Sequence, residues 1–178
     1  MRYRGALANY LIDTGDEVIL VDTGLPAGTP EEAPDEKSPA FTGRDVGTYM
    51  SQFAALGYKP EQVTKILLTH KHADHSGELK SFPNAKIYVN ADEVSADELK
   101  GLGNLVPVTF TEGPYYNFPA SQKIRDGIYY IKAKELPHNT AAHLAVPFPT
   151  SAACRFLDLP PVNLRNLQLH LSKNSLAS

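Results

Sequence analysis

The sequence predicts an α/β protein in which helices cover a mixed β-sheet. Short apolar runs of strand length alternate with segments whose apolar residues have helical spacing. Near the start, two such runs are joined by a Thr-Gly-Asp turn, which indicates a hairpin. The chain has 178 residues, of which 42% are hydrophobic and 21% charged. That size and composition suit one folded domain with its own core.

The first expected element is a β-hairpin over residues 9–24, around the turn at Thr14-Gly15-Asp16. A polar, proline-rich stretch from Pro26 to Arg44 follows, with acidic residues between Glu31 and Glu36. It is long for a connector, which leaves a lid, an insertion or a partly disordered segment as alternatives. Asp45 is then expected to cap a helix. This helix should stop at Gly57. Its apolar residues have helical spacing and are Val46, Tyr49, Met50, Phe53 and Leu56.

The later elements continue the alternation. Further strands are expected at residues 65–69, 85–89, 105–110 and 128–131. A short helix should lie between Ser76 and Pro83, and Asn90 should cap a helix over residues 91–100. Asp126-Gly127 is the expected turn into the last of these strands.

Charge, hydropathy and cysteine content limit the possible function classes and cellular location. The net charge is −3 and the pI about 6.1, so the chain lacks the basic footprint of a nucleic-acid-binding protein. No apolar run reaches the length of a membrane span. The single cysteine, Cys154, cannot form an internal disulfide and is expected to be a buried thiol rather than a nucleophile. These features predict a cytoplasmic protein, and they leave its oligomeric state open.

One short segment concentrates the residues that bind metals. His70-Lys71-His72-Ala73-Asp74-His75 contains three of the six histidines and follows an apolar strand. A solvated polar loop is the alternative, but three imidazoles and a carboxylate at a strand end favour a metal site. His70 and His72 can point at one metal, whereas Asp74 and His75 would bind a second. Such ligands favour zinc, with iron or manganese as alternatives.

This segment, read as H-x-H-x-D-H, resembles the signature of the metallo-β-lactamase superfamily. Residues 9–24 resemble the N-terminal hairpin of that family, which ends in an Asp-Thr-Gly element, here Asp22 to Gly24. The resemblance covers about residues 5–135. The phrase from Leu56 to Glu61 is similar to family members that open lactones and thioesters.

The resemblance implies an αββα sandwich with its metal site at the sheet edge. It implies a metal-dependent hydrolase that uses a metal-activated hydroxide on an ester, thioester or lactone carbonyl of a small-molecule substrate. About two zinc ions per chain would be bound. Asp74 would be both ligand and catalytic residue, orienting the nucleophile or moving its proton. Asp22 would orient the ligands, although a turn-capping carboxylate is an equal alternative.

The remaining ligands should lie in the C-terminal part. His138 is the best candidate for the missing ligand of the first metal, in the place of a Gly-His-Thr loop, and His143 is the alternative. Asp158 is the candidate for a bridging aspartate. His170 would be the last ligand, although a plain surface histidine is the preferred interpretation. Glycine, which permits a tight turn beside a metal, is absent from this segment.

Composition changes at the same place. Residues 136–178 contain no glycine and a single acid, Asp158, whereas the rest of the chain holds 12 glycines and 19 of the 20 acids. We therefore expect a metallo-β-lactamase-like domain at residues 1–135 and a divergent segment at 136–178. A frameshift or truncated reading frame near residue 135 would leave the sandwich incomplete on its C-terminal side; a divergent tail that still folds is the other explanation.

Two other functions remain open on the sequence. A truncated or degenerate family member would bind metal partially and hydrolyse nothing. A flavodiiron-like oxidoreductase fragment would bind iron and need a separate flavin domain.

Overall fold

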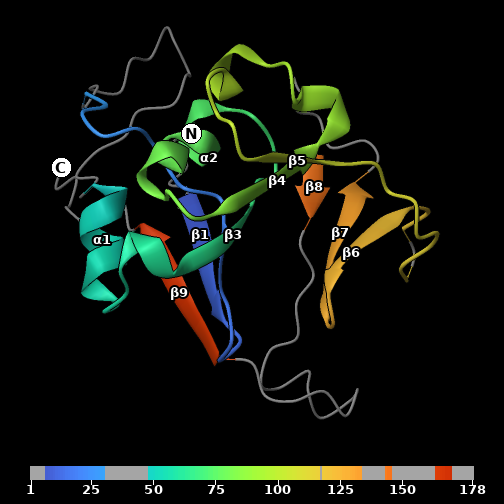
Figure 1. Cartoon of the computed structure of the whole chain (residues 1–178), viewed down its shortest axis with the longest axis horizontal. Coiled ribbons are helices and arrows are strands. Elements are labelled where there is room, and N and C mark those ends of the chain that lie inside the picture. Colours follow the sequence, from blue (N-terminus) through green and yellow to red (C-terminus); the bar gives the residue numbers. More distant parts are fainter. Residues whose placement is uncertain (1–6, 31–47, 117, 134–142, 146–162, 170–178) are drawn as a thin grey trace, which may run out of the picture.

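The computed structural model describes residues 7–30, 48–116, 118–133, 143–145 and 163–169. Two sheets form the fold, one of six strands in the order β5-β4-β3-β2-β1-β9 and one of three in the order β6-β7-β8 (Figure 1). The strands are β1 Leu7–Asp13, β2 Val18–Val21, β3 Val63–Leu67, β4 Lys86–Asn90, β5 Leu105–Val108, β6 Ser121–Arg125, β7 Ile128–Ala133, β8 His143–Ala145 and β9 Asn163–Leu169. The helices are α1 Tyr49–Ala55 and α2 Ala73–Ser76, with 3₁₀ turns η1 Pro60–Gln62, η2 Leu79–Ser81, η3 Ala91–Glu93 and η4 Asp97–Leu99.

The expected hairpin is confirmed by antiparallel pairing of β1 with β2, in which Tyr10 lies opposite Val21. Gly15 in the turn has φ +90°, a conformation that favours glycine. From β2 the sheet continues in parallel through β3 and β4 to β5. The carboxyl ends of these four strands therefore lie at one edge. In open α/β sheets, ligands bind at that edge.

The six-stranded sheet has a core on each face. Figure 1 shows α1 and the β6-β7-β8 sheet on opposite sides of it. On the α1 side, buried residues of the sheet pack with Tyr49, Phe53 and Phe82; the sheet residues include Leu11, Leu20, Ile66 and Ile87. On the other side, Ile128 and Tyr130 of β7 pack with Ile12, Ile19, Val21 and Leu67. Burial on both faces explains why these strands are continuous apolar runs.

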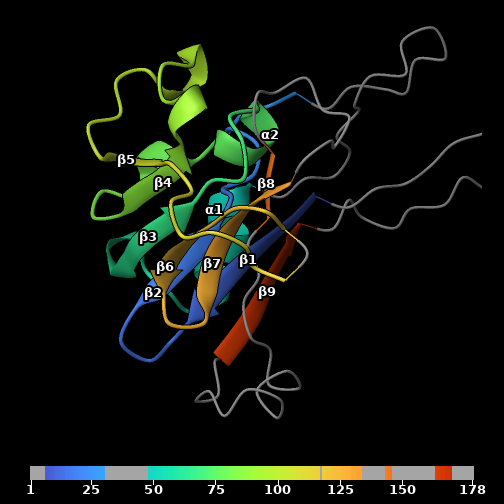
Figure 2. The same cartoon turned by 90° about the vertical axis from the view of Figure 1, so that its right-hand side faces the viewer.

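Figure 2 shows how the sheet divides along its width. Strands β3, β4 and β5 lie together in one half, and β1 and β9 lie in the other. β5 is an edge strand, a position that tolerates Pro107 because an edge strand has neighbours on one side only. The architecture fits the α/β class that the alternating pattern predicts.

Two local predictions differ from the structure, and a third is confirmed. The helix α1 is capped by Thr48, whose hydroxyl accepts a hydrogen bond from Ser51 N at 3.2 Å, whereas Asp45 lies outside the described residues. Asn90 caps as expected, accepting from Asp92 N at 3.2 Å. The helix predicted over residues 91–100 is instead the two turns η3 and η4, because Ala96 between them has extended backbone angles.

The strand β6 was not predicted. Its residues, Ser121 to Arg125, are mostly polar, and Ile124 is its single large apolar residue. Such a strand has too weak an alternation to be recognised from sequence. Its pairing with β7, which the Asp126-Gly127 turn permits, explains its presence.

The C-terminal part of the chain is described only in two strands. β8 pairs with the end of β7, and β9 pairs antiparallel with β1 at the edge of the large sheet. The predicted lid or insertion, Pro26 to Arg44, lies outside the described residues from residue 31 onward. Within the described ranges, no helix is long and apolar enough to cross a membrane.

Candidate metal centre

The metal-binding segment follows β3 at the carboxyl edge of the sheet. β3 ends at Leu67, and His70 is fully buried two residues after the buried Leu68. The chain then turns at His72, which is the N-cap of α2 and whose carbonyl accepts from the backbone N–H groups of His75 and Ser76, both at 2.9 Å. The irregular backbone before α2 lets closely spaced side chains reach one place.

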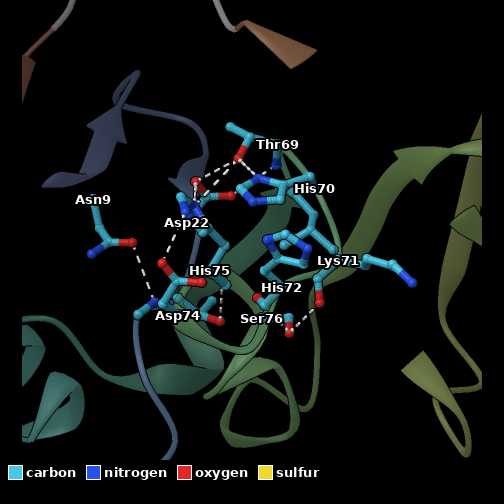
Figure 3. A network of polar contacts seen from close by, with 12 residues as sticks. Asn9, Asp22, Thr69, His70, Lys71, His72, Asp74, His75 and Ser76 are labelled. Carbon is cyan, nitrogen blue, oxygen red and sulfur yellow. Dashed lines mark hydrogen bonds and ion pairs between the residues drawn. The ribbon is translucent and has the colours of Figure 1, made fainter. Parts of the chain in front are cut away.

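The three imidazoles of the motif lie together (Figure 3). The ring centroid of His70 is 4.7 Å from that of His72 and 4.0 Å from that of His75. Nε2 of His75 lies 3.5 Å from Oδ2 of Asp74. The side chain of Lys71 points away from the three rings. The structure thus brings together the four predicted ligands His70, His72, Asp74 and His75.

Asp22 lies behind these ligands and is buried. Its Oδ1 accepts from Thr69 N at 2.8 Å, and its Oδ2 accepts from the Thr69 hydroxyl at 2.8 Å and lies 2.7 Å from Nδ1 of His75. Burial lowers the pKa of His75, but the hydrogen bond and charge of Asp22 outweigh it, so the pKa is raised overall. Asp22 has φ +60°, which is unusual for a residue with a side chain.

These contacts indicate which ring nitrogen of each histidine carries the proton. Because Nδ1 of His75 donates to Asp22, Nε2 carries the lone pair that a metal requires. In His70, Nδ1 lies 3.1 Å from the Thr69 hydroxyl, which itself donates to Asp22, so the same tautomer is favoured. Imidazole nitrogens beside a carboxylate form a donor set that fits zinc.

The Asp22-Thr23-Gly24 loop is attached to α2 by backbone contacts. Thr23 N donates to His75 O at 2.7 Å, and Gly77 N donates to Gly24 O at 2.8 Å. A Cβ on Gly77 would lie 2.2 Å from Pro26 N, so only glycine permits this approach. Asn9 of β1 accepts from Gly24 N at 3.2 Å and secures the loop from the other side.

The described residues do not by themselves complete a metal site. Among them, no group of three His, Cys, Asp or Glu side chains is placed to hold one metal ion. The predicted ligand His138 lies outside the described residues, as do Asp158 and His170. His143 is the first residue of β8, where its backbone pairs with Ala133 at the end of β7.

Three residues with roles at this site were missed by the sequence reasoning. Thr69 links Asp22 to two histidines and directly precedes the motif, a position that is itself a signal. Asn9 secures the Asp-Thr-Gly loop. Glu93 accepts from Lys71 N at 3.0 Å. For Asn9 and Glu93, no local pattern indicates the contact, because each partner lies at least 15 residues away in the chain.

Comparison with known proteins agrees with this geometry. A family model described as the metallo-beta-lactamase superfamily matches residues 4–115, which include both the Asp-Thr-Gly loop and the histidine motif. The match covers more than half of the chain.

Among named relatives, an N-acyl homoserine lactonase of Bacillus cereus is 30% identical over 99 residues, covering 51% of this chain and 39% of the lactonase. A probable metallo-hydrolase of Mycobacterium tuberculosis is 36% identical over 89 residues, covering 47% of this chain and 28% of that protein. The chain thus spans well under half the length of these relatives. A solved N-acyl homoserine lactone hydrolase, with N-hexanoyl-L-homoserine at its catalytic metal centre, superposes with a TM-score of 0.57 at 24% identity, covering 81% of this chain and 58% of that one. This likeness supports the fold.

Proposed function

Because this chain belongs to the metallo-beta-lactamase superfamily, we propose that it is a zinc-dependent hydrolase that opens the ring of a lactone. His70 and His72 would hold one zinc ion, and Asp74 and His75 a second. The convergence of these four side chains, beside the buried carboxylate of Asp22, is the observation that carries the proposal. In open α/β sheets, small ligands bind at the carboxyl edge of parallel strands, which is where these side chains lie.

Zinc bound at this site supplies Lewis-acid chemistry, lowering the pKa of water and polarising a carbonyl group. The protein's own residues then have distinct tasks. Asp22 keeps His75 in the tautomer that presents Nε2, through a 2.7 Å contact with Nδ1. The carboxylate of Asp74 is partly exposed at the site, where it can accept a proton from the attacking water and return it to the leaving oxygen.

A catalytic zinc needs three protein ligands, so each ion requires at least one further side chain. We propose that His138 completes the first site, with His143 as the alternative. Asp158 would bridge the two ions, and His170 remains the weakest candidate. These assignments rest on sequence order, and single alanine substitutions with zinc titration would test each of them.

The choice of a lactone rests on the lactonase relatives, one of which is 30% identical over half of this chain. The phrase from Leu56 to Glu61 does not add to it structurally. It precedes β3, whereas the metal-binding segment follows β3, so the two lie at opposite ends of the strand. Tyr58 in this phrase donates to Asp13 at 2.6 Å, at the hairpin end of the sheet. A thioester is the second substrate class to assay.

The experiment is a turnover assay of the full chain, loaded with zinc, on N-hexanoyl homoserine lactone. We expect ring opening in the wild type and a loss of about a hundredfold or more in His72→Ala, which removes a ligand. Lys71→Ala, whose side chain points away from the rings, is the matched control and should keep its activity. Equal turnover in His72→Ala and the control would contradict the proposal.

A degenerate family member is the second candidate, and one observation favours it. Among the described residues, no group of three ligands is placed to hold one metal ion. We retain the proposed division at residue 135, with 136–178 as a divergent segment, of which the structure describes the strands β8 and β9. A downstream reading frame at the locus that encodes a Gly-His-Thr loop would support the truncation, and its absence would reject it.

A further inference from the structure

A buried carboxylate in the turn η3, which follows β4, contacts the metal-binding segment from the β4 side, whereas Asp22 contacts it from the β2 side. Oε2 of Glu93 accepts a hydrogen bond at 3.0 Å from the backbone N–H of Lys71, the residue between His70 and His72. We propose that Glu93 is a positioning residue that holds the His70–His72 backbone in the geometry needed to bind the first zinc ion. This inference rests on the proposed metal centre.

The fold brings Glu93 to this place. β3 and β4 run parallel, with Leu67 opposite Tyr88, and Leu68 N donates to Tyr88 O at 3.0 Å, so their carboxyl ends emerge together. β4 ends at Asn90, whose side chain caps the turn η3 by accepting from Asp92 N. In a capping box, the carboxylate three residues after the cap turns back to the cap's own N–H. Here the carboxylate of Glu93 instead accepts from Lys71 N, in the loop that follows β3.

The contact is to the backbone and not to the lysine side chain. Nζ of Lys71 lies 3.9 Å from Oε2 of Glu98, and both of these side chains are about one third exposed. Glu93 is 3% exposed. Two carboxylates thus meet the same residue in different ways, one at its peptide N–H inside the protein and one at its ammonium group near the surface. An N–H held between two ligands restricts the position of both.

The environment of Glu93 destabilises the folded state. Among the described residues, its Oε1 is buried without a hydrogen-bond partner. Burial is the main cause that raises the pKa of Glu93 to about 6. A buried carboxylate with one oxygen unpaired costs free energy, and an apolar residue would fill the same space without that cost. We attribute the presence of a carboxylate at this position to its one hydrogen bond, which holds the backbone N–H of Lys71.

The test compares Glu93→Ala, Glu93→Gln and the matched control Glu98→Gln in the full chain. Zinc affinity is measured by competition with a chromophoric chelator, and folding by circular dichroism. We expect Glu93→Ala to bind zinc about 10- to 100-fold more weakly. Glu93→Gln, whose amide oxygen can still accept from Lys71 N, should recover most of this loss. Glu98→Gln should stay within about twofold, since exposed pairs contribute little.

A second measurement separates this inference from the proposed function. Hydrogen exchange of the Lys71 amide is followed in the zinc-free chain, where Glu93→Ala should exchange faster than the wild type and Glu98→Gln should not. If Glu93→Ala does not fold, Glu93→Asp replaces it, because its side chain is one methylene too short to keep the contact. Failure of the wild type to bind zinc would reject the metal centre, and the Lys71 exchange would then still decide whether Glu93 holds this segment. Unchanged Lys71 exchange with unchanged zinc affinity in the folded variant would overturn the inference.

Discussion

The metal-binding segment is held from two sides that work differently. On the β2 side, Asp22 contacts a side chain that is itself a proposed ligand, His75, at 2.7 Å. On the β4 side, Glu93 contacts only backbone, the N–H of Lys71 at 3.0 Å. Asp22 has three hydrogen-bonding contacts shared between its two oxygens, whereas one oxygen of Glu93 has no partner among the described residues.

The difference indicates a division of tasks. The β2 side fixes both the tautomer of His75 and the packing of α2, because the Asp-Thr-Gly loop is bonded to His75 and Gly77. Substitutions on the β2 side should weaken folding and zinc binding together. The β4 side restrains a short stretch of backbone, so damage there should affect zinc binding more than folding. The following variants test this contrast, from the largest expected effect to the smallest.

Gly77→Ala should have the largest effect, on the β2 side. The new Cβ would lie 2.2 Å from Pro26 N and 2.5 Å from Gly24 O, so the loop must move away from α2. We expect a loss of about 3 kcal/mol or more in the free energy of unfolding. Gly103→Ala is the control, since no described atom lies within 4 Å of its Cβ, and should stay within about 0.5 kcal/mol. Urea unfolding measures the stability of both variants. Equal unfolding midpoints for Gly77→Ala and Gly103→Ala would contradict the proposed need for glycine at position 77.

Asp22→Asn should weaken zinc binding about 10- to 100-fold and destabilise the chain by about 2 kcal/mol. The amide nitrogen cannot accept from the Thr69 hydroxyl and from His75, so two contacts are lost. Chelator competition and urea unfolding give the two quantities. Asp97→Asn, at an exposed surface pair, serves as the control. A loss of zinc affinity with wild-type stability would contradict the dual task of this side.

Glu93→Gln should change the pH dependence of stability on the β4 side. The pKa of Glu93 rises from 4.5 to about 6 in the folded chain, so the folded state binds this proton more tightly. The free energy of unfolding therefore falls as pH rises through this window, by up to about 2 kcal/mol. The amide cannot ionise, so the zinc-free variant should be more stable than the wild type at pH 7.5. That gain should vanish below about pH 4.5, and a gain that persists there would contradict the assignment.

Tyr130→Phe should have the smallest effect. The buried hydroxyl of Tyr130 lies 3.0 Å from Tyr88 O and 3.2 Å from Leu68 O, so it joins the ends of β3 and β4 to the second sheet. Its loss should cost about 1 kcal/mol in thermal or urea unfolding and leave zinc affinity unchanged. Tyr129→Phe, on the other face of β7, is the control. A large drop in zinc affinity would show that the β4 side depends on this hydroxyl as well.

The sequence predicted those parts of the molecule whose pattern is local. The hairpin around Gly15 and the strand before His70 are continuous apolar runs with clear turns, and both are confirmed. The helix after Asn90 was wrong in extent because the break at Ala96 is a backbone conformation that composition does not reveal. The polar strand β6 was missed because its residues lack a clear alternation and its pairing with β7 leaves no local pattern.

The candidate site follows the same rule. His70, His72, Asp74 and His75 are contiguous, so a pattern identifies them, and the family match includes them. Glu93 reaches the site through the parallel ends of β3 and β4, and Asn9 through the antiparallel pair β1 and β2, and no spacing in the sequence encodes those contacts. His138 stays a prediction because it lies outside the described residues.

The zinc content of the purified full chain, measured by elemental analysis after reconstitution and desalting, tests the central claim most directly. We expect about two zinc ions per chain in the wild type and at most about one in His72→Ala. Less than about one zinc ion in the wild type, with the same content in His72→Ala, would contradict a dinuclear centre built on this motif.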